Sequence, residues 1–282
     1  MIHLNPIDEK IFNYVLNEIN LAFPFKRKPK YDNEYYLKKI IYMLKSGCTY
    51  REANHGPIKN HYSSIYKKYN QWVTSGFFDD LFSKLVGKYK KKRRKKLKKN
   101  LHKSSLLTLF VDSSNIRNKN GSELLGRTYQ DKRKKGNKIT VICDQEKFPL
   151  IIDISAANVH DSKILTSSKP IKKSLFDLHK DLKLTKINLA GDMGYIINDN
   201  KKKLLFKNKI KIIHPYRKNQ GRKNSKSDRK ILKERHKVEN LFASLKQFKK
   251  IQLRYDSKIK NYEAFVKLAL TFIGLRILFR DT

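Results

Sequence analysis

The stretch SLLTLFVDSS, residues 105–114, is a short apolar run that ends abruptly in an aspartate. Its length and its content of aromatic and β-branched residues predict a buried strand rather than a helix. Further short apolar runs follow, and we expect strands near residues 105–113, 138–144, 148–156, 186–192 and 209–215. Helical patterns lie between the later strands, over residues 160–182 and 197–208. The whole pattern therefore predicts a mixed α/β sheet.

The N-terminal part of the chain has a different pattern, with apolar and aromatic residues at helical spacing. One such segment ends at Gly47, and Thr49 with Glu52 is typical of a capping box. A later helical segment is interrupted near Ser75. This region predicts a small all-α domain that is compatible with a helix-turn-helix DNA reader, although a generic small bundle would look similar.

A basic run, KYKKKRRKKLKK at residues 88–99, follows the helical region. Such a run repels itself, which indicates a linker or an extended arm on DNA phosphates; a nuclear localisation signal and a merely solvated charged helix are the alternatives. We expect three parts: a helical DNA-binding domain over residues 1–87, a basic linker over 88–104, and an α/β domain over 105–282 that includes a C-terminal helix.

The charge of the chain indicates its class of partner. Lys and Arg number 65 against 25 Asp and Glu, a formal net charge of +40, which favours nucleic acid first and an anionic membrane surface second. The most apolar segment, FVKLALTFIGLRILF, is interrupted by Lys267 and Arg276, and the N-terminus lacks the apolar core of a signal peptide. We therefore expect no membrane role and a soluble intracellular protein, whose compartment stays open.

Two aspartates end predicted strands. Asp112 follows the run LTLFV, and Asp192 follows INLAG. Two carboxylates at neighbouring strand ends repel each other unless protons or a divalent cation compensate, and such oxygen ligands suit Mg²⁺ or Mn²⁺. The alternative is that each Asp only caps a turn. Asp144, Asp153 and Asp161 also follow apolar runs, so position alone does not choose among them.

Six stretches occur in order along nearly the whole chain: LKSGCTYREAN, LFVDSSNIR, GRTYQDKRKKGNKITVICDQEKFPL, ANVHDSKIL, AGDMGY and RHKVENLFASLKQFKKIQLRYD. Together they resemble the DDE transposases of bacterial insertion sequences, in the compact group with an N-terminal helical domain. The resemblance implies an RNase H-like fold, a mixed five-stranded sheet flanked by helices, after a small all-α, helix-turn-helix-like N-terminal domain.

The resemblance also selects the candidate catalytic residues. Asp112 and Asp192 match the first and second catalytic Asp of the family, and Glu239 matches its catalytic Glu. It implies that these carboxylates hold two Mg²⁺ or Mn²⁺ ions. The implied reaction is metal-dependent cleavage at transposon ends, followed by transfer of the freed strand into target DNA.

The family's C-terminal signature, Tyr-x2-Arg-x3-Glu-x6-Lys, is met by Arg235, Glu239 and Lys246, whereas Leu232 stands where the Tyr would be. By the resemblance, Arg235 and Lys246 hold DNA phosphates. On a helix, Val238 and the later apolar residues would form one stripe, with the signature residues along its edge. The alternative for Glu239 is an ordinary surface ion pair with Arg235, four residues before it.

Three residues of the matching stretches stay ambiguous. His160 and Asp161 are explained by an Asp N-cap about as well as by a role in the site. Tyr195 is placed equally well beside the DNA end or in the protein core.

The implied partners are double-stranded DNA, as transposon terminal inverted repeats and as target DNA, and a second copy of the chain in a homodimer or larger assembly. Three other functions stay open. The first is a catalytically lapsed, transposase-derived DNA-binding protein. Another RNase H-like nuclease, such as a junction resolvase, is the second. The third is a general basic chromatin or ribosomal protein, for which the Asp, Asp and Glu pattern would have no purpose.

Overall fold

The computed structural model of the protein describes residues 6–25, 29–54, 61–99, 106–128, 134–197, 209–216, 221 and 223–280. The chain divides into two compact units. The helical unit comprises Met1–Leu85, Asn118–Glu123 and Ser244–Thr282, and the sheet unit comprises Val86–Arg117 and Leu124–Ala243. These limits differ from the predicted domains, because the C-terminal helix clusters with the N-terminal helices. The DNA-binding and catalytic roles assigned to the predicted domains stay predictions.

The N-terminal region is helical, as the sequence predicts. It contains α1 (Pro6–Ala22), α2 (Asn33–Ser46), the short 3₁₀ helix η1 (Glu52–Asn54), α3 (Tyr62–Thr74) and α4 (Phe77–Lys99). Gly47 ends α2 with a φ of 76°, a conformation that favours glycine. The predicted capping box is confirmed, since the backbone N–H of Thr49 donates to Glu52 at 2.7 Å and that of Glu52 to the Thr49 hydroxyl at 3.3 Å.

The C-terminal helix α11 (Ile259–Arg280) belongs to the helical unit because apolar residues lie almost all around it. Tyr69 of α3 stacks on Phe265 with ring centroids 4.5 Å apart, and its hydroxyl donates to the carbonyl of Asn261 at 2.7 Å. The short elements α10 (Lys249–Gln252) and β7 (Leu253–Arg254) precede α11. Sequence distance alone could not reveal this association.

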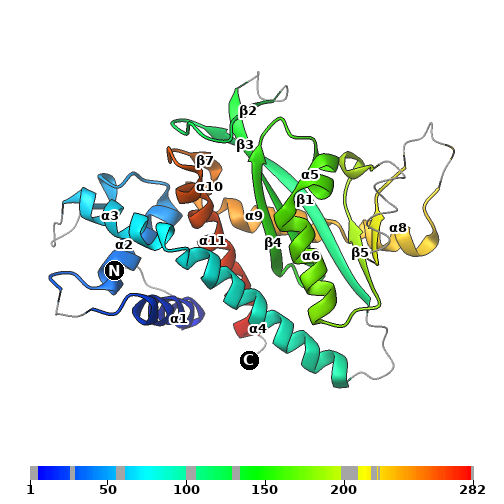
Figure 1. The fold of residues 1–282 in the computed structure, drawn as a ribbon, viewed down its shortest axis with the longest axis horizontal. Coiled ribbons are helices and arrows are strands. Elements are labelled where there is room, and N and C mark those ends of the chain that lie inside the picture. Colours follow the sequence, from blue (N-terminus) through cyan, green and yellow to red (C-terminus); the bar gives the residue numbers. More distant parts are fainter. Residues whose placement is uncertain are drawn as a thin grey trace. The chain divides into compact units, whose positions relative to one another are not determined.

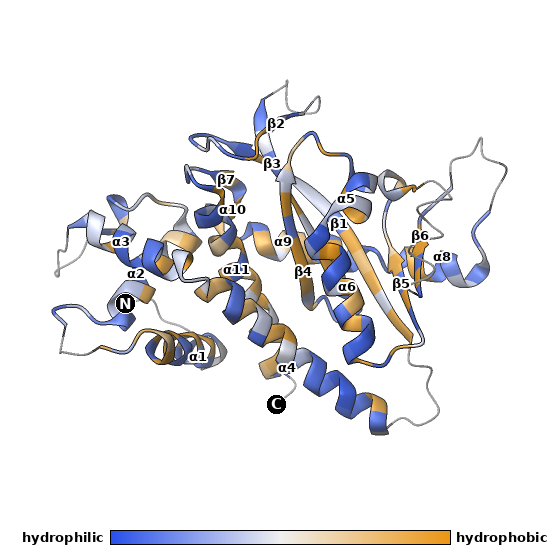
Figure 2. Cartoon of the chain, in the orientation of Figure 1, coloured by the Kyte–Doolittle hydropathy of each residue, from blue (hydrophilic) through white to orange (hydrophobic). Residues whose placement is uncertain are grey.

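The structure corrects the prediction made for the basic run. Residues 88–99 are the last turns of α4 rather than an extended linker. Lys90 and Arg94 bond to the side chain and carbonyl of Asp181, both at 2.7 Å. Tyr89 stacks on Phe148 with centroids 4.6 Å apart. These contacts fix the helix on the sheet unit despite its charge; Figure 2 shows its strongly hydrophilic end. Residues 100–104, which complete the predicted linker, lie outside the described residues.

The five predicted strands are confirmed as β1 (Leu106–Asn118), β3 (Lys135–Asp144), β4 (Pro149–Ala156), β5 (Lys186–Ala190) and β6 (Ile210–Ile213). Their order is β4-β3-β1-β5-β6, with the two-residue β2 (Gly126–Arg127) also on β3. Pairing is antiparallel from β4 through β1 and parallel from β1 through β6. The sheet is mixed, as predicted. In the part of the chain that the structure describes it has seven strands rather than five, because β2 and β7 also pair with β3 and β1.

Helices cover both faces of this sheet. In Figure 1, α5 (Asp161–Ser167) and α6 (Lys169–Asp181) lie in front of the sheet and α9 (His236–Lys246) lies behind it. The strands between them are apolar, and Cys143 of β3 is 0% exposed. The helix predicted near residues 197–208 falls almost entirely outside the described residues. Where the structure describes the chain, no helix combines the length and apolarity needed to cross a membrane.

Candidate active site

Two parallel strands place Asp112 and Asp192 just beyond the same end of the ladder that joins β1 to β5. The β1–β5 ladder ends with Phe110 opposite Ala190. Asp112 lies two residues beyond this last pair on β1, and Asp192 lies two residues beyond it after β5. The sequence predicted both aspartates at strand ends. Asp192 does follow the end of β5, whereas Asp112 lies inside β1, which continues to Asn118 and pairs there with β3.

Asp192 also caps a short helix. Its Oδ1 accepts a hydrogen bond from the backbone N–H of Gly194 at 2.8 Å, at the start of the 3₁₀ helix η3 (Met193–Tyr195). Asp192 therefore caps a turn, which is the alternative role that the sequence left open for it. This capping does not exclude a role in a site, because the cap uses Oδ1.

Glu239 comes from the first turn of α9. The predicted apolar stripe of this helix is buried and consists of Val238, Leu241, Phe242 and Leu245. Arg235 lies in the turn between α8 (Lys226–Lys233) and α9, and its Nη2 donates to Oε1 of Glu239 at 2.6 Å. The Glu239 side chain is 51% exposed and that of Arg235 24%. The ordinary ion pair that the sequence left open is thus formed.

The charges of these residues influence one another. Burial raises the pKa of Asp112, and the nearby charges of Asp192 and Glu239 raise it further, while the Ser113 N–H and the Arg235 cation oppose the rise. Burial alone would lower the pKa of Arg235, but its bond to Glu239 and the charges of the two aspartates raise it. One guanidinium therefore interacts electrostatically with all three carboxylates.

These carboxylates suit a divalent ion in their chemistry, since Mg²⁺ and Mn²⁺ prefer oxygen ligands. They do not converge on one point. Among the described residues, no three His, Cys, Asp or Glu side chains lie close enough together to hold a metal ion. Asp112 and Asp192 are the neighbouring pair, and Glu239 is engaged by Arg235.

Two other residues of the signature lie on the flanking helices. Lys246 is exposed at the end of α9, two helical turns after Glu239 and so about 10 Å along the axis. Leu232, which replaces the signature Tyr, lies half-buried in α8. The sequence analysis did not predict this helix.

The remaining strand-end aspartates lie elsewhere or have other partners. Asp144 pairs with Leu109 at one end of the β1–β3 ladder, three residue pairs from Asp112, and accepts a hydrogen bond from the Tyr89 hydroxyl at 2.7 Å. Asp153 belongs to β4, two strands away from β1. Neither lies beside Asp112.

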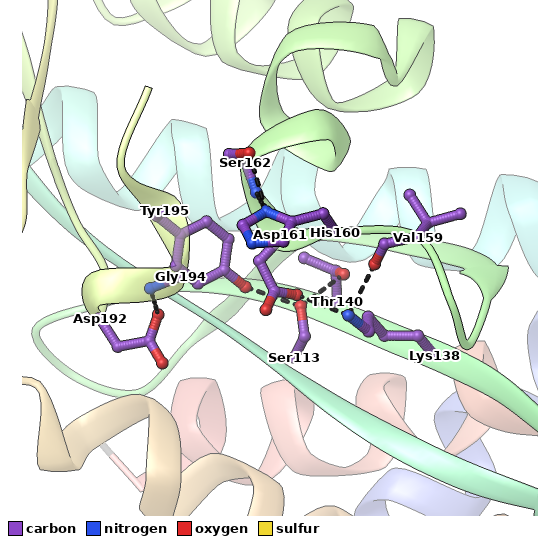
Figure 3. A network of polar contacts seen from close by, with 10 residues as sticks. All are labelled: Ser113, Lys138, Thr140, Val159, His160, Asp161, Ser162, Asp192, Gly194 and Tyr195. Carbon is purple, nitrogen blue, oxygen red and sulfur yellow. Dashed lines mark hydrogen bonds and ion pairs between the residues drawn. The ribbon is translucent and has the colours of Figure 1, made fainter. Parts of the chain in front are cut away.

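The motif at the start of α5 is organised differently from the expectation. His160, not Asp161, is the N-cap, and its Nδ1 accepts from the N–H of Ser162 at 3.3 Å. Asp161 instead forms an ion pair with the buried Lys138 of β3 at 2.9 Å (Figure 3). The ion pair lay outside what the sequence could indicate, because its partners belong to different elements.

Tyr195 is a core residue, 1% exposed. Its hydroxyl forms a hydrogen bond of 2.6 Å with that of Ser113, which in turn lies 2.8 Å from the Thr140 hydroxyl. The sequence analysis singled out neither Ser113 nor Thr140. The only signal for Ser113 is that it follows Asp112 directly.

Comparisons with known proteins place this geometry in context. The family described as Transposase DDE domain matches residues 103–273, well over half of the chain. A solved structure, the cryo-EM structure of a piggyBac transposase synaptic complex with hairpin DNA, is 11% identical, with a TM-score of 0.49. That alignment covers 98% of this chain and 73% of the other. No curated protein sequence matches the chain.

Proposed function

The chain belongs to the DDE transposase family, and we propose that it is an active DNA transposase whose catalytic carboxylates are Asp112, Asp192 and Glu239. The proposal rests above all on Asp112 and Asp192, which follow the last residue pair of two neighbouring parallel strands. Glu239 joins them from α9, and its charge contributes to the raised pKa of Asp112.

The family uses divalent metal ions, and we propose two Mg²⁺ or Mn²⁺ ions here. Asp112, Asp192 and Glu239 would hold them. When bound, such ions lower the pKa of an attacking water and stabilise the attacking and leaving oxygens of a phosphodiester. Glu239 would have to exchange its partner Arg235 for an ion.

Arg235 and Lys246 would then bind DNA phosphates. A guanidinium released from Glu239 offers a planar fork of donors that matches a phosphate. Lys246 is exposed on the same edge of α9 as Glu239, since seven residues complete nearly two turns. These contacts position DNA without reading its bases.

The partners are double-stranded DNA, as terminal inverted repeats and target, and a second copy of the chain. The large positive charge favours DNA along an extended surface. In the reaction, the chain's carboxylates would first position a water at the transposon end. They would then hold the freed 3′-hydroxyl for attack on target DNA.

The test is cleavage of a plasmid that carries the DNA flanking this gene, with Mg²⁺, Mn²⁺ or Ca²⁺. We expect discrete cuts with Mg²⁺ or Mn²⁺, lost in Asp112→Ala and Glu239→Gln, while DNA binding persists. The matched control is Asp144→Asn, which alters a strand-end aspartate away from the site and should still cut. Binding without metal-dependent cuts would favour a lapsed DNA-binding protein. Preferential cutting of branched DNA would indicate another nuclease of this fold.

A further inference from the structure

A hydrogen bond joins the two chain segments that carry the candidate catalytic aspartates. Ser113 directly follows Asp112 on β1, and Tyr195 ends the 3₁₀ turn that Asp192 caps. Their hydroxyls are 2.6 Å apart (Figure 3). Each partner of this bond thus lies within three residues of one aspartate.

The bond lies where the sheet itself no longer connects these segments. The β1–β5 ladder ends with Phe110 opposite Ala190, so Asp192 lies beyond its last pair. The ladder therefore joins β5 to β1 no further than Ala190. The hydrogen bond between Tyr195 and Ser113 connects the two segments one turn later.

The segment is shaped around the Tyr195 ring. A Cβ added at Gly191 would lie 2.6 Å from Cδ2 of Tyr195, so only glycine lets the ring lie this close to the end of β5. At Gly194 an added Cβ would lie 3.0 Å from Oδ1 of Asp192 and 3.1 Å from Oδ2 of Asp161. The two glycines of AGDMGY therefore serve close packing around the ring and the Asp192 carboxylate.

Neighbouring elements hold both ends of the bond. The Ser113 hydroxyl also bonds to Thr140 of β3 at 2.8 Å. Two residues earlier on β3, buried Lys138 donates to the carbonyl of Val159 at 2.7 Å and to Asp161 at 2.9 Å. Asp161 thereby flanks Gly194 in a fixed position. Figure 3 shows these contacts as one network beside Asp192.

We propose that Tyr195 is a positioning residue, whose hydroxyl bond to Ser113 holds the Asp192 carboxylate in place opposite Asp112 for metal binding. This inference rests on the proposed function. Groups that orient metal ligands commonly change metal affinity 10–100-fold when they are removed. Tyr195 is suited to the task because its hydroxyl adds no further negative charge. Burial and the charges of Asp161, Asp112 and Asp192 raise its pKa, so it stays neutral.

The test measures Mn²⁺ binding by the full chain, from the loss of the electron paramagnetic resonance signal of unbound Mn²⁺. Tyr195→Phe removes one oxygen and leaves Ser113 its bond to Thr140. We expect the Mn²⁺ dissociation constant to rise about 10-fold. Ser113→Ala should have a similar effect. The double variant should be no worse than either single one, because both remove the same bond.

Tyr89→Phe is the matched control. Tyr89 is another buried tyrosine of the sheet unit, whose hydroxyl bonds to Asp144 instead. It should leave the Mn²⁺ dissociation constant unchanged, even if it lowers the thermal midpoint as much as Tyr195→Phe does. Equal Mn²⁺ binding by Tyr195→Phe and the unaltered protein would overturn the inference, as would equal weakening by Tyr89→Phe.

Asp112→Asn separates this inference from the proposed function. It should abolish Mn²⁺ binding. Binding that persists in Asp112→Asn would refute the metal assignment, and the positioning role with it. Binding that depends on Asp112 but not on Tyr195 would leave the proposed function standing and refute only the positioning role.

Discussion

Arg235 donates to Glu239 at 2.6 Å, and the same guanidinium lies within the electrostatic influence of Asp112 and Asp192. A single cation thus stabilises a cluster of carboxylates that would otherwise repel one another. The residue proposed to bind DNA is also the residue that neutralises the proposed metal ligands. Substitution of Arg235 should therefore change the stability of the protein even in the absence of DNA.

Arg235→Ala should lower the free energy of unfolding at low ionic strength by roughly 0.5–1 kcal/mol, a typical value for a partly exposed ion pair. Adding Asp112→Asn should restore part of the loss, because one repelling charge is removed. Arg235→Lys, which keeps the charge, is the control. Urea titrations at low and high salt measure these differences, which should shrink with screening. An effect that salt leaves unchanged would indicate lost packing instead.

Gly191→Ala should destabilise the protein by about 1–3 kcal/mol, the usual range for overpacking, because its Cβ would overlap the Tyr195 ring. Gly87→Ala provides the contrast. Gly87 lies inside α4 with nothing within 4 Å of an added Cβ, so alanine should stabilise by about 0.5–1 kcal/mol. Thermal denaturation of both variants checks the pair. The prediction fails if the two substitutions shift the midpoint in the same direction.

Asp144 should make stability depend on pH. Burial raises its pKa above the ordinary 3.8, although the Tyr89 hydroxyl and the Phe148 N–H oppose the rise. The folded state therefore takes up this proton before the unfolded state does. The stabilisation is complete below 3.8 and is lost as pH rises through the raised pKa. Relative to the non-titrating Asp144→Asn, the unaltered protein should gain thermal stability as pH falls, and a constant difference would contradict this.

Lys246→Gln should weaken DNA binding and reduce its dependence on salt. Each phosphate contact contributes about 0.9 to the slope of log K against log salt concentration, so one lost contact should lower the slope by about that amount. Fluorescence anisotropy with a DNA duplex at several salt concentrations measures both. Lys173→Gln, an exposed lysine of α6, should leave the slope unchanged. An equal change of slope in both variants would show that Lys246 makes no specific phosphate contact.

The strands were predictable because each contains a short apolar run, and the candidate aspartates follow from where those runs end. The run does not mark the end of β1, which continues to Asn118. The helix α8 was not predictable, since none of its residues is buried and only Ile231 and Leu232 in it are apolar. Its stability comes from the Ser225 cap and from the ion pair between Lys211 and Asp228 at 2.6 Å. Contacts of this kind do not leave an apolar pattern.

The basic run was misjudged for a related reason. Mutual repulsion predicts an extended segment, but the partner that anchors Lys90 and Arg94, Asp181, lies far away in the sequence. The bond between Tyr195 and Ser113 was likewise beyond prediction. It depends on which strands are neighbours and on their register, and a single sequence does not reveal either.

The deep burial of Cys143 in β3 makes the sheet accessible to a kinetic experiment. Burial raises the pKa of this thiol, so it is unreactive while the strands around it stay paired. Cys48 is more exposed and should react first. The slower modification of Cys143 by a thiol reagent then reports how often the central strands separate. A ligand that binds at the edge of this sheet should slow that modification in proportion to its occupancy.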